Sequence, residues 1–189
     1  ANTSLTNYWS SYKNFMMKKN NNGSYESIFT AFRNRLYQLI ARVFPGSSSL
    51  RVWLHRRRGV TIGEEVFIGT DVIIDTSTPY KVYIGDNVII SMRATLIGHF
   101  GNYGLEHVQN RKFSIVIEDN CFIGPGTIIM PNVTISAGSV VSAGSVVTLS
   151  VPKGTMVQGN PAKPVARCSI PLTRSTPMWD FVKKLKPIR

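Results

Sequence analysis

The chain has 189 residues and a formal net charge of +12, and 43% of its residues are hydrophobic while 17% are charged. This composition is typical of a folded globular protein and excludes a disordered chain. No run of about 18 uncharged apolar residues occurs, so we expect no membrane-spanning helix. The two cysteines, Cys121 and Cys168, match neither a disulfide framework nor a paired metal-ligand spacing, which favours the reducing cytoplasm.

The positive charge lies in the two flanks of the chain. Residues 1–58 carry a net charge of +9 and residues 152–189 carry +7, whereas residues 59–151 carry −4. The basic residues are not interleaved with aromatic side chains that could stack on bases, so we expect no nucleic-acid partner.

The first 58 residues predict an arm followed by two helices. Residues 1–23 are rich in Asn, Ser and Lys, which indicates a mobile arm. Residues 24–44 place apolar side chains at helical spacing until Pro45 and Gly46 end the pattern, so we expect an amphipathic helix. Residues 50–58 predict a second short helix that contains His55 and three consecutive arginines. We interpret residues 24–58 as a helical cap and His55 as a surface or packing residue.

An aliphatic residue recurs every six positions between residues 59 and 151. The period fits neither a helix nor a hairpin, but it fits a triangular coil in which three hexads close one turn. Twelve hexads therefore predict a mainly β fold, a parallel β-helix of about four coils, whose hand the spacing does not give. The inward residues are Ile62, Ile68, Ile74, Ile84, Ile90, Leu96, Ile117, Ile123, Ile129, Ile135, Val141 and Val147.

Two breaks interrupt the hexads, and breaks in a solenoid become loops on its outside. Four extra residues lie near positions 76–80, and a longer excursion loop runs over residues 99–114. Because loops carry chemistry more often than coils do, these breaks are the first place to seek a site. After the last hexad, residues 152–189 form an extension with a short helix expected near residues 179–185.

An ordered set of motifs follows the first break. It comprises Ile84-Gly85-Asp86-Asn87-Val88, then Gly98-His99, a basic loop with His107, Ile123-Gly124, Ser142-Ala143-Gly144-Ser145, and Gly159-Asn160-Pro161-Ala162-Lys163. From Ile84 to Arg167 this order resembles the hexapeptide-repeat acetyltransferases, among them the maltose, galactoside and serine enzymes. The resemblance implies a left-handed β-helix, a homotrimer, and acetyl-coenzyme A as acyl donor bound between subunits, with no metal.

The resemblance also assigns roles to residues of this chain. It makes His99 the general base that takes the proton of an acceptor hydroxyl, a role that suits a neutral imidazole near pH 7. The glycine before His99 would let the backbone approach a ligand closely. The coenzyme residues would be Ala143, Gly144, Lys153, Gly159, Asn160, Lys163 and Arg167 in the 152–189 extension and the corner before it. Asp75, Tyr80, Glu106 and His107 would face the acceptor. Ordinary loop residues and solvated charges are the competing interpretation of these positions.

Two departures from the family pattern stand out. The last corner lacks the usual lysine before its proline, and Lys153 is the substitute that the sequence offers. Pro125 occupies a position where relatives offer a backbone N–H near the thioester, and proline has no such donor. Cys121 falls on a small inward position of the repeat, which indicates a structural residue.

Several functions stay open. The leader of residues 24–58 resembles that of acetyltransferases in polysaccharide assembly, so we favour O-acetylation of a sugar or glycan precursor. Its arginines could also attract an anionic membrane surface. The alternatives are N-acetylation of an amino sugar or nucleotide sugar, a non-enzymatic β-solenoid that binds partners, and a zinc enzyme of the gamma-class carbonic anhydrase type, which needs three converging histidines.

Overall fold

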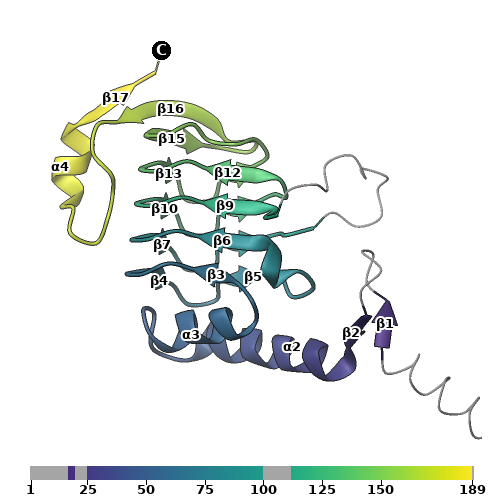
Figure 1. Cartoon of the computed structure of the whole chain (residues 1–189). Coiled ribbons are helices and arrows are strands. Elements are labelled where there is room, and N and C mark those ends of the chain that lie inside the picture. The colour runs from purple at the N-terminus through teal and green to yellow at the C-terminus, as the bar shows by residue number, and fades with distance from the viewer. Residues whose placement is uncertain (1–16, 20–24, 100–111, 189) are drawn as a thin grey trace, which may run out of the picture.

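The computed structural model describes residues 17–19, 25–99 and 112–188 (Figure 1). The twelve hexads form twelve short strands that stack into three parallel sheets. The first sheet contains β3 (Thr61–Ile62), β6 (Val82–Ile84), β9 (Ile115–Ile117) and β12 (Val133–Ile135). The second contains β4 (Phe67–Ile68), β7 (Ile89–Ile90), β10 (Phe122–Ile123) and β13 (Val140–Val141). The third contains β5 (Ile73–Ile74), β8 (Thr95–Leu96), β11 (Ile128–Ile129) and β14 (Val146–Val147).

The register of the sheets is the one that the repeat predicts. Ile62 pairs with Ile84, Ile84 with Ile117, and Ile117 with Ile135, so that one inward residue lies above another in every coil. All twelve predicted inward residues are buried and belong to one core cluster. The β-helix fold class, with four coils and helical segments at both ends, is confirmed.

Two helices close the first coil, as expected. They are α2 (Ile28–Val43) and α3 (Leu50–Arg57). The first helix begins four residues later than predicted because Tyr25–Ser27 form strand β2, which pairs antiparallel with β1 (Met17–Lys19). These strands place part of the predicted arm in regular structure, while residues 1–16 and 20–24 of that arm lie outside the described residues.

The face of α2 that meets the β-helix is its polar face. The buried residues of α2 are Asn34, Gln38 and Ala41, whereas its large apolar side chains are exposed. The reason is that the open edge of the first coil presents backbone groups that need hydrogen-bond partners. Gln38 meets this need, since its Nε2 donates to the carbonyl of Val72 at 2.8 Å.

Three arginines of the α3 region complete this edge, one for each sheet. Arg56 Nε donates to the carbonyl of Ile62 at 3.1 Å, Arg51 to that of Ile68 at 3.0 Å, and Arg58 to that of Ile74 at 2.8 Å. The expectation that the arginine cluster is available to an external anion is therefore wrong for Arg58, which is buried. Arg57 remains exposed and lies over the ring of Trp53.

The C-terminal extension folds over the second sheet. Strand β15 (Thr155–Gln158) continues that sheet in parallel, and β16 (Lys163–Cys168) and β17 (Leu185–Pro187) add to it antiparallel. The predicted terminal helix is α4 (Met178–Lys183). In the described ranges no helix has both the length and the apolar character needed to cross a bilayer.

Candidate active site

The two breaks in the repeat leave the β-helix at the same corner. The first follows β5 and the second follows β8, and these strands are neighbours in the third sheet. The amide of Asp75 donates to the carbonyl of Leu96 at 3.0 Å, so the start of one insertion lies against the start of the other. Asp75 and Leu96, which are 21 positions apart in the sequence, thus come together. Counting the hexads in threes would have shown this, because both breaks follow the third hexad of a coil.

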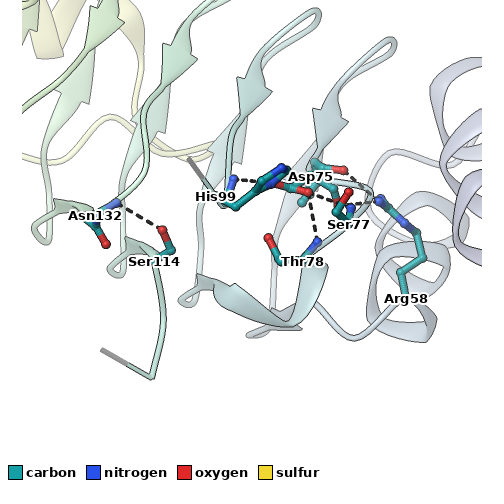
Figure 2. A network of polar contacts seen from close by, with 9 residues as sticks. Arg58, Asp75, Ser77, Thr78, His99, Ser114 and Asn132 are labelled. Carbon is teal, nitrogen blue, oxygen red and sulfur yellow. Dashed lines mark hydrogen bonds and ion pairs between the residues drawn. The ribbon is translucent and has the colours of Figure 1, made fainter. Parts of the chain in front are cut away.

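At this corner His99 meets Asp75. The imidazole Nδ1 lies 2.5 Å from Asp75 Oδ2 (Figure 2). The Asp75 side chain is only 4% exposed, whereas 45% of the His99 side chain is accessible. One edge of the imidazole is therefore fixed by the protein, and the side chain is open enough to meet a reactant.

The other bonds of Asp75 are made within the chain. Its Oδ2 also accepts from the amide of Gly98 at 2.7 Å, and its Oδ1 accepts from the amides of Ser77 at 2.8 Å and Thr78 at 3.0 Å. This arrangement differs from the expectation that Asp75 faces the acceptor. Its carboxylate serves the imidazole and the loop instead.

The electrostatics keep Asp75 ionised. Burial raises the pKa of its carboxyl, but the hydrogen bonds from His99, Thr78 and Ser77 outweigh burial and hold that pKa below its ordinary value. A carboxylate accepts a proton rather than donating one, so it fixes the tautomer with hydrogen on Nδ1. The other nitrogen, Nε2, then carries the free lone pair that a general base needs.

Arg58 supports the pair from the side of the cap. One of its terminal nitrogens donates to the backbone carbonyl of Asp75 at 2.7 Å as well as to that of Ile74. Arg58 also contacts His55 Nδ1 at 2.9 Å and the side chain of Gln38. Burial lowers the pKa of Arg58 to about 10, partly offset by the charge of Asp75, so it stays cationic at neutral pH. His55 is buried as a packing residue, and burial, reinforced by Arg58, lowers its pKa to about 3.

Gly98 has a steric role at this corner. A Cβ at this position would lie 2.9 Å from Thr78 Oγ1 and 3.2 Å from Asp75 Oδ2. Thr78 Oγ1 is itself buried and makes no hydrogen bond in the described part of the chain. The glycine therefore permits the close approach of two loops, rather than the approach of a ligand suggested by the sequence.

Of the remaining acceptor candidates, one lies at this corner and two lie outside the described residues. Tyr80 lies in the short 3-10 helix η1 (Pro79–Lys81) at the same corner, and it is exposed. Glu106 and His107 fall in the segment 100–111, outside the described residues.

The coenzyme candidates lie at two different corners. Ala143 and Gly144 follow β13, and Gly159 and Asn160 follow β15, which pairs with β13, so these four residues lie together with Lys163 nearby at the start of β16. Lys153 and Arg167 lie at the opposite end of β15, where Arg167 donates to Thr155 Oγ1 at 2.9 Å. Within one chain the two groups therefore lie at opposite ends of β15.

The amides of the first corner differ in availability. Gly144 N donates to the carbonyl of Pro125 at 2.8 Å, so it has no hydrogen left for a ligand. The amide of Ala143 makes no hydrogen bond to any described residue. Of the two predicted backbone contacts, only Ala143 is therefore free to donate.

The cysteines do not offer an alternative nucleophile. Cys121 is fully buried in the core, where burial raises the pKa of its thiol to about 12, and burial raises that of Cys168 to about 11. A thiol of this kind is almost entirely protonated at neutral pH and reacts poorly. Among residues 17–19, 25–99 and 112–188, no three His, Cys, Asp or Glu side chains gather in a way that could hold a metal ion.

An imidazole oriented by a buried carboxylate can remove the proton of a hydroxyl or an amine, and this is the class of chemistry that the corner of the β-helix offers. Comparison with known proteins narrows this class. Residues 114–148 match the family model described as bacterial transferase hexapeptide (six repeats), and residues 59–96 match the hexapeptide repeat of succinyl-transferase.

Curated relatives extend the match beyond the repeats. Protein CapG of Staphylococcus aureus is 37% identical over 135 residues, which cover 69% of this chain and 78% of the relative. The putative acetyltransferase YvoF of Bacillus subtilis is 33% identical over 132 residues, which cover 69% of this chain and 74% of the relative. Galactoside O-acetyltransferase of Escherichia coli is 38% identical over 87 residues, which cover 44% of this chain and 43% of the relative.

A solved structure shares the fold. It is a hexapeptide-repeat acetyltransferase of Vibrio cholerae in complex with acetyl coenzyme A, with a TM-score of 0.51 and 24% identity over 74% of this chain and 87% of that one. The chain belongs to the hexapeptide-repeat acetyltransferase family, and it is an acyltransferase.

Proposed function

We propose that this acyltransferase moves an acetyl group from acetyl-coenzyme A to a hydroxyl of a sugar or glycan precursor, with His99 as general base. The observation that carries the proposal is the contact between His99 Nδ1 and the buried carboxylate of Asp75 at 2.5 Å. It leaves the Nε2 lone pair available on a half-exposed side chain.

The reaction follows from this tautomer. His99 Nε2 takes the hydroxyl proton as the acceptor oxygen forms a bond to the thioester carbonyl carbon. The resulting imidazolium is stabilised by the Asp75 carboxylate, which keeps its negative charge. When the carbon–sulfur bond breaks, the imidazolium returns the proton to the departing thiolate. The products are the acetyl ester and the free thiol, and no acyl-enzyme forms.

The coenzyme is assigned to the corner of Ala143, Gly159 and Lys163. The amide of Ala143 is an available donor, and the Lys163 ammonium suits a phosphate. The third sheet joins this corner to that of His99, so a long flexible donor could lie along it. By family resemblance we expect a homotrimer, in which Lys153 and Arg167 of each subunit could approach the coenzyme bound beside its neighbour.

A sugar acceptor is favoured by the names of relatives, among them the galactoside O-acetyltransferase. N-acetylation of an amino sugar uses the same base, because an amine must also lose a proton when it attacks the thioester. The two alternatives differ in the product, since an ester is cleaved by mild alkali and an amide is not.

The test is a thiol-release assay with acetyl-coenzyme A against a panel of mono-, oligo- and nucleotide-linked sugars, some of them amino sugars. We expect turnover with a hydroxyl acceptor and an alkali-labile product. His99→Ala should lower kcat by about 10² to 10⁴ while the variant still binds acetyl-coenzyme A in calorimetry. Unchanged turnover in His99→Ala would overturn the assignment of the base.

A further inference from the structure

One surface of the part of the chain that the structure describes is apolar and uncovered. Five side chains of α2 form it, at spacings of three and four residues that place them on one side of the helix. We call this the α2 apolar face, formed by Phe29, Phe32, Leu36, Leu39 and Val43. Their relative exposure runs from 41% at Leu36 to 71% at Phe29, so none of the described residues covers them. Exposed patches of large apolar side chains usually mark interaction sites.

The helix cannot turn this face inward. The opposite side of α2 is tied to the first coil, where Gln38 binds the carbonyl of Val72 and Arg42 Nε binds Asp71 Oδ1 at 2.7 Å. Ala41 on the same side is only 1% exposed. The helix lies across the end of the column of coils (Figure 1). The α2 apolar face therefore points away from the β-helix.

The charged side chains of α2 itself all have one sign. Within Ile28–Val43 there are three arginines and no acidic residue. Arg33 and Arg35 are exposed, whereas Arg42 is neutralised by Asp71. From α3, Arg57 lies 5.1 Å from the centre of the Trp53 ring, which in turn lies 6.1 Å from the ring of Tyr37. Tryptophan and tyrosine are enriched where apolar lipid meets water.

We propose that the α2 apolar face docks the protein on the surface of an anionic lipid bilayer. A helix with bulky apolar residues on one side and only cationic charges beside them is typical of segments that lie in the plane of a membrane interface. Its 16 residues span about 24 Å, so it would lie flat on the surface. A second copy of the same face fits less well, because the arginines of two copies would approach without an acidic partner.

The experiment uses the full chain and vesicle flotation. The vesicles contain phosphatidylcholine alone, or phosphatidylcholine with phosphatidylglycerol at about one lipid in three. We expect binding to the anionic vesicles to be at least about tenfold tighter than to the neutral ones, and to weaken as salt is raised. Phe32→Ser with Leu39→Ser should weaken it by about tenfold or more, and Arg33→Glu with Arg35→Glu should remove the preference for anionic lipid.

Matched controls separate the face from general surface effects. Leu149→Ser with Trp179→Ser removes two exposed apolar side chains elsewhere, and Lys184→Glu with Lys186→Glu makes the same change of charge in the C-terminal region. Both should bind anionic vesicles as the parent does, and circular dichroism checks that each variant is folded.

Absent vesicle binding, or binding by the Phe32/Leu39 variant that equals binding by the parent, would overturn the proposal. So would a lower mass of that variant in analytical ultracentrifugation, because the face would then be an interface between copies.

Discussion

Arg58 donates a hydrogen bond of 2.7 Å to the backbone carbonyl of Asp75, the residue whose carboxylate orients His99. The cap and the candidate active site therefore share one buried side chain. Because the guanidinium is a rigid fork, it fixes the backbone at Ile74 and Asp75 together. The position of the imidazole thus depends on a residue of the α3 region, outside the β-helix.

Replacing Arg58 should affect both stability and activity. Arg58→Met leaves the buried carbonyls of Ile74 and Asp75 without a donor, which we expect to lower the free energy of unfolding by about 3 kcal/mol. Denaturant unfolding measures this value, and kcat should fall with it as Asp75 shifts. Arg57→Met, one position earlier but exposed, should change stability by less than about 0.5 kcal/mol. Equal effects of the two substitutions would contradict a specific role for Arg58.

Asp75→Asn tests the orientation of the base. The amide of asparagine can donate to Nδ1 and stabilise the wrong tautomer, so kcat should fall by about 10² to 10⁴ while the KM for acetyl-coenzyme A is unchanged. Steady-state kinetics in both substrates provide the measurement. Asp71→Asn is the matched control, because Asp71 is also in the first coil but pairs with Arg42 at another corner. A kcat of Asp75→Asn equal to that of the parent would exclude a role of Asp75 in orienting His99 as the base.

Gly98→Ala tests the close approach of the two loops. The new methyl group would meet Thr78 Oγ1 at 2.9 Å and Asp75 Oδ2 at 3.2 Å, so one of these side chains must shift, and Asp75 is the one that holds His99. We expect kcat to fall by about tenfold or more, since small displacements of a base are costly. Gly138→Asn is the control, because the equivalent turn positions of earlier coils are held by Asn87 and Asn120 at similar positive φ. If Gly98→Ala retains full activity, the glycine has no such role.

His55 should make the protein sensitive to acid. Its pKa is about 3 when folded and 6.5 when exposed, so the unfolded chain binds a proton that the folded chain excludes. The stability from a neutral His55 is complete above pH 6.5 and is lost as the pH falls from 6.5 toward 3. Within that window His55 contributes about 1.4 kcal/mol per pH unit to the slope of the free energy of unfolding against pH. Urea unfolding between pH 7 and pH 4 should show a shallower slope in His55→Gln than in the parent, and parallel slopes would refute the prediction.

The two coenzyme corners can be told apart by charge reversal. Lys163→Glu should raise the KM for acetyl-coenzyme A by about tenfold, because the lysine pairs with Gln158 at the end of β15 that carries the proposed coenzyme corner. Lys153→Glu, at the other end of β15, should have the smaller effect. A larger effect of Lys153→Glu would place the donor at the corner of Lys153 and Arg167 instead.

The sequence predicts the β-helix well because the spacing of the repeat shows which residues contact one another. Each inward aliphatic, such as Ile62, Ile84 or Ile117, lies above the one a coil earlier, so the spacing states the pairing directly. The same count locates the loop that begins at His99. The pairing of His99 with Asp75 does not follow from either break alone, because it depends on the two breaks being neighbours at one corner.

The orientation of α2 could not be predicted from its own residues. Helical periodicity shows that Phe32 and Leu36 share a face, but it does not say which face meets the coil. That choice is made by the unpaired carbonyls of the first coil, which require donors such as Gln38. For the same reason the sequence does not show that Arg58 is buried, since nothing in a run of arginines distinguishes the one that is buried.

The arginine cap has a consequence for how such a protein can vary in length. At one end of the column each wall finishes on a guanidinium, and at the other end β16 and β17 turn the chain back on itself. Neither end of the column therefore presents a free coil edge to which a duplicated repeat could be added. Coils can be gained or lost only within the column, and only as complete turns, since a partial turn would move the next inward residue to a different wall.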